Sequence, residues 1–193
     1  GVWRYNLPRP PHIDHSVMVD GIPGGKAGWV PLTEESMYVL YVGTEPGNPR
    51  FPVETLADEF RKRLAPYGGE IAKLRDGITD PAQVVYRPLE AILMPAPWYR
   101  DRVVLIGDAA HGTTPHLGQG AAQAVEDAVV RAELLDAHAI EDALPAFMER
   151  RYERTKFIWE ASVQIGQLEQ DNSPDDDPAG LTVRMLEVVS API

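Results

Sequence analysis

The chain has 193 residues, 44% of them hydrophobic and 24% charged, a composition typical of a globular protein with one domain or two small ones. Its net charge of −11 argues against nucleic acid and anionic membranes as partners, and no apolar run reaches the roughly 18 residues that a membrane helix needs. Because cysteine is absent, neither a disulfide nor a thiolate metal site can form, which is compatible with a cytoplasmic location.

The first part of the chain predicts an antiparallel sheet of about four strands. The strand-like runs cover residues 2–7, 15–19, 29–32 and 37–43. Turn-forming residues dominate 21–28 and connect the second run to the third. Pro31 indicates an edge position for its strand, because proline cannot donate a hydrogen bond to a neighbouring strand.

The next part predicts a helix, a helical turn and a long strand. Apolar residues at helical spacing mark an amphipathic helix over 53–65, and residues 71–76 add a short helical turn. Residues 84–94 have the composition of a long strand that Pro88 interrupts. We place a first domain, a sheet with its helix, at residues 1–95 and a second domain at 96–193.

The most informative stretch begins with a predicted strand and an acidic residue. The four branched apolar residues from Val103 to Ile106 predict a buried strand, and Gly107 and Asp108 follow directly. In open α/β sheets, ligands bind at the carboxyl ends of the strands. Asp108 is therefore a candidate ligand-binding residue.

A short loop and a glycine-rich helix start follow this acid. The loop carries His111, Pro115 and His116, and Gly118-Gln119-Gly120 opens the helix. A bare helix start offers free N–H groups and the positive end of a dipole to an electron-rich ligand. The apolar positions of this helix are Ala121, Val125, Ala128, Val129, Ala132 and Leu135. Two further helices are predicted, over 141–170 and 181–189.

The ordered run from Gly107 to Ala122 resembles the second FAD-binding segment of single-component flavin-dependent aromatic hydroxylases, the p-hydroxybenzoate hydroxylase-like group. Gly107-Asp108-Ala-Ala-His111, then Pro115, then the glycine-rich helix start carry this resemblance. It implies that Asp108 binds the ribityl hydroxyls of FAD and that the Pro115 carbonyl lies beside the reactive edge of the flavin. It also implies that Gly118, Gln119, Gly120 and Ala121 face the pyrimidine end of the flavin, with Ala122 following. A common form of the family has asparagine in place of Ala122, so that polar contact is not expected here.

The resemblance covers essentially this whole chain but only the later part of the family's chain. A Gly-x-Gly-x-x-Gly turn, which would receive the pyrophosphate of FAD, is absent, because the glycines at 21–25 have the wrong spacing. The family's mid-chain Asp-Gly motif is absent as well. We therefore expect a C-terminal fragment, or one half of a cleaved or split enzyme. A separate chain carrying the N-terminal half is a candidate partner, and a homo-oligomer stays open.

The expected fold is α/β (α+β): an antiparallel substrate-domain sheet followed by the C-terminal strand and helices of an FAD-binding domain, without the N-terminal dinucleotide-binding half. The resemblance implies an FAD-dependent monooxygenase that uses NADH or NADPH as co-substrate and hydroxylates a small aromatic or heteroaromatic substrate. Two alternatives stay open. One is another flavin oxidoreductase of this fold, such as an oxidase, epoxidase or reductase, and the other is a non-catalytic remnant acting as an interaction module.

His116 is the candidate catalytic residue, because it follows Pro115 and could orient a phenol or accept its proton near neutral pH. A packed or solvent-facing role explains it equally well. His111 and His116 together with Asp108 could suggest a metal site, but the histidines lack the i, i+4 spacing that would direct both at one ion, and we predict none.

Overall fold

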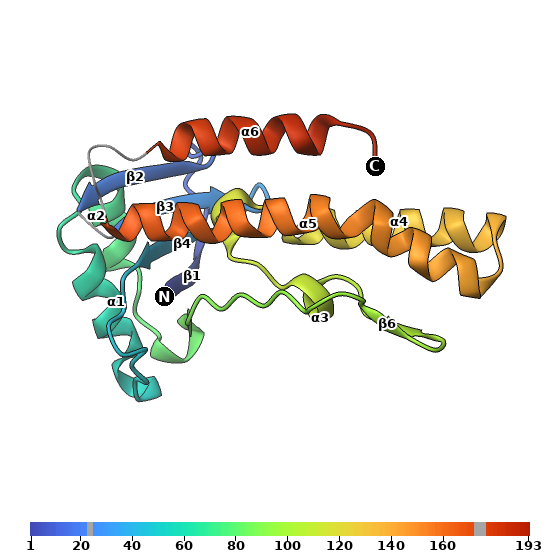
Figure 1. The fold of residues 1–193 in the computed structure, drawn as a ribbon. Helices are drawn as coiled ribbons and strands as arrows, with labels where there is room; N and C mark the ends of the chain where they lie inside the picture. The colour runs from blue at the N-terminus through green and yellow to red at the C-terminus, as the bar shows by residue number, and fades with distance from the viewer. Residues whose placement is uncertain (23–24, 172–176) are drawn as a thin grey trace. The chain divides into compact units, whose positions relative to one another are not determined.

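The computed structural model describes residues 1–22, 25–171 and 177–193, which divide into two compact units (Figure 1). The first unit contains Gly1–Leu89 and the end of the longest helix from Glu169. The second contains Glu90–Leu168 and the C-terminal helix. No helix in the described ranges is both long and apolar enough to cross a membrane.

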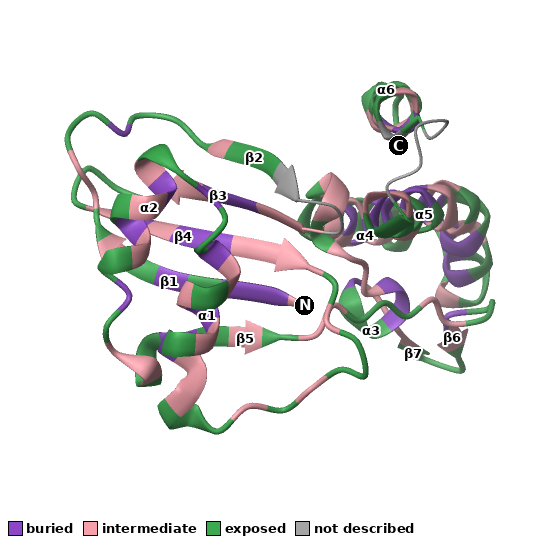
Figure 2. Ribbon diagram, turned by 90° about the vertical axis from the view of Figure 1, so that its left-hand side faces the viewer, coloured by how far each residue is buried: buried purple, intermediate pink, exposed green. Residues whose placement is uncertain are grey.

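The first unit is built on a five-stranded antiparallel sheet with the order β2-β3-β4-β1-β5 (Figure 2). Its strands are β1 (Val2–Pro8), β2 (Val17–Ile22), β3 (Gly25–Pro31), β4 (Ser36–Gly43) and β5 (Val85–Arg87). Two helices, α1 (Leu56–Leu64) and α2 (Gly69–Asp76), lie over one face of this sheet, and two 3₁₀ turns, η1 (Val53–Thr55) and η2 (Pro81–Gln83), flank them.

The core of this unit lies between the sheet and the two helices. Because side chains alternate along a strand, Trp3 and Tyr5 of β1 point to the same face, and their partners across the pair are Tyr41 and Val39 of β4. The fully buried side chains of this core include Trp3, Met37, Val39, Phe60, Leu64 and Ile78. Arg4, Tyr38 and Leu40 occupy alternate positions and point to the opposite face of the sheet.

An ion pair and an aromatic cluster meet at Trp3. Its ring stacks on Tyr86 with centroids 4.3 Å apart, and the Arg63 guanidinium lies 4.2 Å from the Trp3 ring centroid. The Trp3 indole N–H donates to Glu45 Oε1 at 2.8 Å, and Arg63 donates to the same carboxylate through Nε and Nη2. The Glu45 side chain is only 7% exposed, so this carboxylate is a buried acceptor shared by three donors.

Two strand predictions in this unit are wrong. The strand with Pro31 is not at the edge, because β3 lies between β2 and β4. Pro31 is its last residue, and β2 pairs with β3 only as far as Trp29, so no β2 residue stands opposite the proline. The strand also begins at Gly25, inside the segment expected to be a turn. The long strand expected over 84–94 shortens to β5, because Pro88 ends it after three residues.

The second unit is mostly helical. A two-stranded hairpin, β6 (Tyr99–Arg100) and β7 (Val103–Val104), precedes α3 (Asp108–His111) and the 3₁₀ turn η3 (Pro115–Leu117). Three longer helices follow: α4 (Gly120–Ala137), α5 (Ile140–Asp171) and α6 (Pro178–Ser190). The last two confirm the helices predicted over 141–170 and 181–189. Trp98, Ala110, Val130, Phe147 and Met148 form the main core of this unit.

The prediction of a buried strand from Val103 to Ile106 is wrong. Only Val103 and Val104 are in a strand, and Val103 is 67% exposed. A strand of branched apolar residues is fully buried when other strands pair with both of its edges and other elements pack on both of its faces. In the described residues β7 pairs with β6 alone.

The apolar positions of the helix after Gly120 do not mark its buried face. The apolar residues Val125 and Val129 are exposed, whereas α4 buries Gln123 and Asp127 beside Val130. Apolar spacing cannot reveal this arrangement, because the buried polar side chains are stabilised by partners on other elements.

Candidate functional site

A strained turn presents Asp108 at the start of α3. Gly107 has φ +57° and ψ −141°, which L side chains rarely adopt, and a methyl group there would lie 3.1 Å from the Cβ of Ala124. The turn therefore lies close against the first turns of α4. Asp108 follows as the first residue of α3, exposed, and its carboxylate receives no hydrogen bond from the described part of the chain. This carboxylate is available to a ligand.

The start of α4 is also open. The first N–H groups of any α-helix have no carbonyl partner within the helix, and the N-cap residue Gln119 supplies no side-chain capping bond to them. Gly118 before it is left-handed at φ +64°. Ala121 and Ala122 in the first turn are exposed. Uncapped N–H groups and the helix dipole favour an electron-rich ligand here.

The loop between α3 and the start of α4 is bonded to one face of α5. Trp159 donates its indole N–H to the Gly112 carbonyl at 3.1 Å, and the Ser162 hydroxyl donates to the Thr114 carbonyl at 2.7 Å. One helical turn further on, the His116 ring lies against Gly166. Positions 159, 162 and 166 share one face of a helix, and they fix alternate residues of the loop.

A buried network of charged side chains connects the α3 turn to α4 and α5. Asp127 Oδ2 accepts from the Gly107 N–H at 3.0 Å and lies 2.6 Å from Nε2 of His111. Asp127 Oδ1 accepts from Arg151 Nε at 2.8 Å, and Arg151 also donates to Glu126 and to the side-chain carbonyl of Gln123. Asp127 and Arg151 are fully buried and His111 nearly so.

These contacts decide the charge states of the two carboxylates. Burial opposes ionisation of Asp127, but hydrogen bonds from His111, the Gly107 amide and Arg151 outweigh it and hold the pKa of Asp127 below its ordinary value. Burial likewise opposes ionisation of Glu126, and the two arginines, Arg154 and Arg151, lower its pKa overall. Both groups are therefore carboxylates at neutral pH.

The structure places the predicted flavin-contact residues in one unit, and it shows one close approach between their two segments, that of Gly107 to Ala124. Gly107, Asp108, Pro115 and the helix start at Gly118-Gln119-Gly120-Ala121-Ala122 all belong to the second unit, and the α3 turn lies against α4. His116 packs on α5, and His111 pairs with Asp127. Sequence reasoning missed Asp127 and Arg151. The available signal was a polar pair, Gln123 and Asp127, at i, i+4 on one face of a helix.

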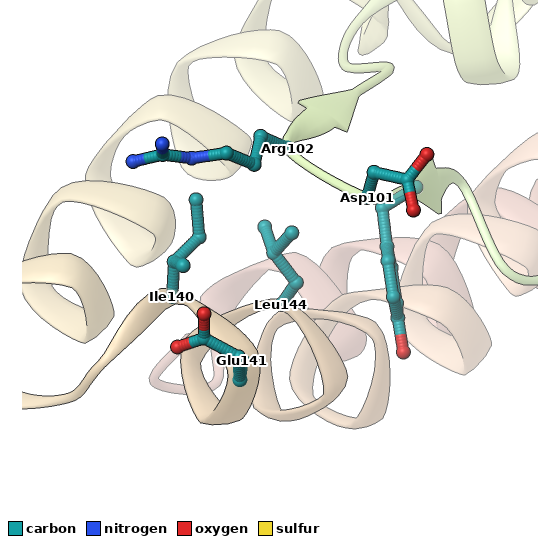
Figure 3. Close-up of a pocket in the computed structure, with 6 residues that line it drawn as sticks. Asp101, Arg102, Ile140, Glu141 and Leu144 are labelled. Carbon is teal, nitrogen blue, oxygen red and sulfur yellow. The ribbon is translucent and has the colours of Figure 1, made fainter.

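A separate pocket of about 270 Å³ lies between the β6–β7 hairpin and the start of α5 (Figure 3). Tyr99, Asp101 and Arg102 from the hairpin and Ile140, Glu141 and Leu144 from α5 line it. None of these residues belongs to the Gly107–Ala122 segment, so this pocket is distinct from the site described above.

The family described as FAD binding domain matches residues 29–164 of the chain. A putative FAD-dependent monooxygenase of Bacillus subtilis, YetM, is 30% identical over 167 residues, which are 86% of this chain and 45% of that protein. The 2-heptyl-3-hydroxy-4(1H)-quinolone synthase of Pseudomonas aeruginosa is 37% identical over 158 residues, 78% of this chain and 40% of that protein. The chain thus spans less than half the length of these relatives.

Solved structures share the fold. Klebsiella pneumoniae HpxO complexed with FAD and uric acid has a TM-score of 0.80 at 22% identity, covering 98% of this chain and 48% of that one. A salicylate hydroxylase substrate complex has a TM-score of 0.71 at 23% identity, covering 99% of this chain and 54% of that one. The expected combination of antiparallel sheet and C-terminal helices is therefore confirmed as the fold of this chain.

Proposed function

Since the chain belongs to the FAD binding domain family, we propose that it supplies the substrate sheet and the C-terminal flavin-binding segment of an FAD-dependent monooxygenase. The substrate part corresponds to residues 1–95 and the flavin part to 96–193, an assignment supported by the two compact units. The names of the relatives from B. subtilis and P. aeruginosa support the reaction class.

One observation carries the proposal: an exposed carboxylate and an uncapped helix start lie in the same unit, on a turn and a helix that touch. Asp108 would accept hydrogen bonds from the ribityl hydroxyls of FAD, and such charge-assisted bonds are stronger than neutral ones. The N–H groups of Gly120, Ala121 and Ala122, with Gly118 and Gln119 before them, would face the pyrimidine end. The Pro115 carbonyl would lie beside the reactive edge.

Bound FAD would supply two-electron chemistry, with NADH or NADPH as the reductant and dioxygen as the source of the transferred oxygen atom. The residues of this chain would hold the flavin, orient the substrate ring and exclude water. The α4 dipole would stabilise negative charge at the pyrimidine end by about 0.3–1 kcal/mol, and more in a buried setting.

For the substrate we propose a small aromatic or heteroaromatic ring bound at the sheet face opposite α1 and α2. This face carries the half-buried Tyr38, and the guanidinium of the exposed Arg4 lies 5.6 Å from the Tyr38 ring centroid. An aromatic side chain with one nearby cation suits a flat ring that bears an acidic substituent.

His116 is the residue we propose to act on the substrate, because it adjoins Pro115. His116→Gln should lower the rate of ring hydroxylation while the flavin content of the purified protein stays constant. Equal loss of flavin and activity would instead assign His116 a packing role against Gly166.

The deciding experiment uses the natural polypeptide that contains these residues. Its flavin content is measured by absorbance, and NADH and NADPH consumption is followed with a panel of aromatic acids and phenols under ¹⁸O₂. One ¹⁸O atom in the product per reduced nucleotide consumed supports the monooxygenase. Hydrogen peroxide without labelled product would identify an oxidase or reductase, and a protein without flavin would favour the interaction module.

A further inference from the structure

The Asp127 carboxylate joins the two ends of α3. This helix has only four residues, Asp108–His111. The amide of Gly107, directly before the helix, and the ring of His111, its last residue, both meet Oδ2 of Asp127, at 3.0 and 2.6 Å. A single oxygen atom from α4 thus closes the turn that contains Asp108.

The other carboxylate oxygen is held from a third element. Arg151 of α5 donates Nε to Asp127 Oδ1 at 2.8 Å, and its remaining nitrogens bind Glu126 and Gln123 of α4. The guanidinium therefore fixes the direction of the Asp127 carboxylate and supplies its counter-charge. Both side chains are 0% exposed, so solvent does not screen the pair.

Packing alone is a poor explanation for these residues. Burying an ion pair has a large desolvation cost, and apolar residues of similar volume often stabilise a core at least as well. What an apolar residue could not do is accept the Gly107 N–H and the His111 ring together. The buried Asp127 carboxylate lies at the point where the backbone enters the candidate flavin-binding segment, and there it accepts hydrogen bonds that an apolar side chain could not accept.

We infer that Asp127 is a positioning residue that clamps the Gly107–His111 turn and so presents the Asp108 carboxylate to the ligand. The hydrogen bonds of Asp127 define the clamp without reference to any ligand, whereas its effect on FAD binding rests on the proposed function. Asp127 does not touch the ligand; it acts through Gly107 and His111.

The test compares Asp127→Asn with Glu126→Gln in the natural polypeptide. Each variant removes one negative charge beside Arg151, but Glu126 contacts neither Gly107 nor His111. Hydrogen–deuterium exchange of a peptide covering 107–112 is measured after the flavin has been stripped, so the readout needs no activity. Asp127→Asn should accelerate exchange at least about tenfold, the effect of losing one hydrogen bond to a charged group, whereas Glu126→Gln should stay within about twofold.

Flavin affinity is measured separately by fluorescence titration. Faster exchange with an FAD Kd raised about tenfold or more supports the inference in full. Unchanged exchange in folded Asp127→Asn overturns the clamp, whatever the flavin affinity. Faster exchange in a protein whose wild type binds no flavin supports the clamp and rejects the proposed function instead.

A measurement on the wild type covers the case in which Asp127→Asn does not fold. Long-range ¹H–¹⁵N spectra report whether Nε2 of His111 carries a proton that exchanges slowly, as donation to the buried Asp127 requires. An unprotonated or rapidly exchanging Nε2 at pH 7 would overturn the inference.

Discussion

His116 packs so closely on Gly166 that a methyl group at position 166 would lie 2.5 Å from the imidazole Cε1. Alanine in the middle of a helix normally stabilises it by about 1 kcal/mol relative to glycine. At this position the gain should be reversed by overpacking, which typically costs about 1–3 kcal/mol. We expect Gly166→Ala to lower the free energy of unfolding measured by denaturant titration.

The matched control for that change is the same substitution in a His116→Ala background. Without the ring, Gly166→Ala should stabilise α5 as in any other helix. If Gly166→Ala changed the free energy of unfolding equally in both backgrounds, the predicted clash between the new methyl group and the His116 ring would be refuted.

Removing the charge of Asp108 should weaken flavin binding. Asp108→Asn keeps the shape of the side chain but loses charge-assisted hydrogen bonds worth about 1.5–3 kcal/mol, so the FAD Kd should rise about tenfold to a hundredfold. Asp136→Asn serves as the control, because Asp136 is an exposed acid near the other end of α4. An unchanged Kd for Asp108→Asn in a flavin-binding protein would remove Asp108 from the site.

Asp127 should make the stability of the protein acid-sensitive. Its pKa in the folded protein lies below the value of about 3.9 in an unfolded chain, so the unfolded state takes up protons first as the pH falls. The stabilisation is therefore complete at neutral pH and is lost below about pH 4 as the folded pKa is approached. His111, Arg151 and Glu126 are the charged or titratable groups that face this carboxylate or its guanidinium partner.

The measurement is the unfolding free energy of wild type and Asp127→Asn at pH 7 and at successively lower pH. The difference between the two proteins should be largest at neutral pH and should shrink in acid. A difference that stays constant from pH 7 to pH 3 would contradict an ionised Asp127 in the native state.

Glu45 should be a stability determinant of the first unit. Burial opposes its ionisation, but hydrogen bonds from Arg63 and Trp3 hold the pKa of Glu45 below its ordinary value. Glu45→Gln removes one of the two carboxylates that pair with Arg63, while Glu59 Oε2 remains 3.1 Å from Arg63 Nη1, so the loss of unfolding free energy should be about 1.5–3 kcal/mol, the usual value for hydrogen bonds to a charged group. Glu34→Gln, on an exposed turn, should stay within about 0.5 kcal/mol, and a similar loss for both variants would refute the argument.

Sequence patterns predicted those strands and helices that depend on residues close together in the chain. Alternation predicted the four main strands, and helical spacing predicted α1 and α5. The order of Gly107, Asp108, Pro115 and the glycine-rich helix start led to the candidate site, whose role stays a prediction. Sequence reasoning failed where partners are distant in the chain. Val125 and Val129 are exposed because Asp127 is buried, and Asp127 is buried because Arg151, 24 residues later, reaches it.

The shared carboxylate of Asp127 also limits which substitutions its hydrogen-bond partners can tolerate. Since Gly107, His111 and Arg151 all donate to one group, the energetic effects of substituting His111 and Arg151 should not add, and a double variant should lose less than the sum of the single ones. A replacement at any one position leaves the others with an unmatched buried group. In homologous chains the three side chains at 111, 127 and 151 should therefore change together or not at all.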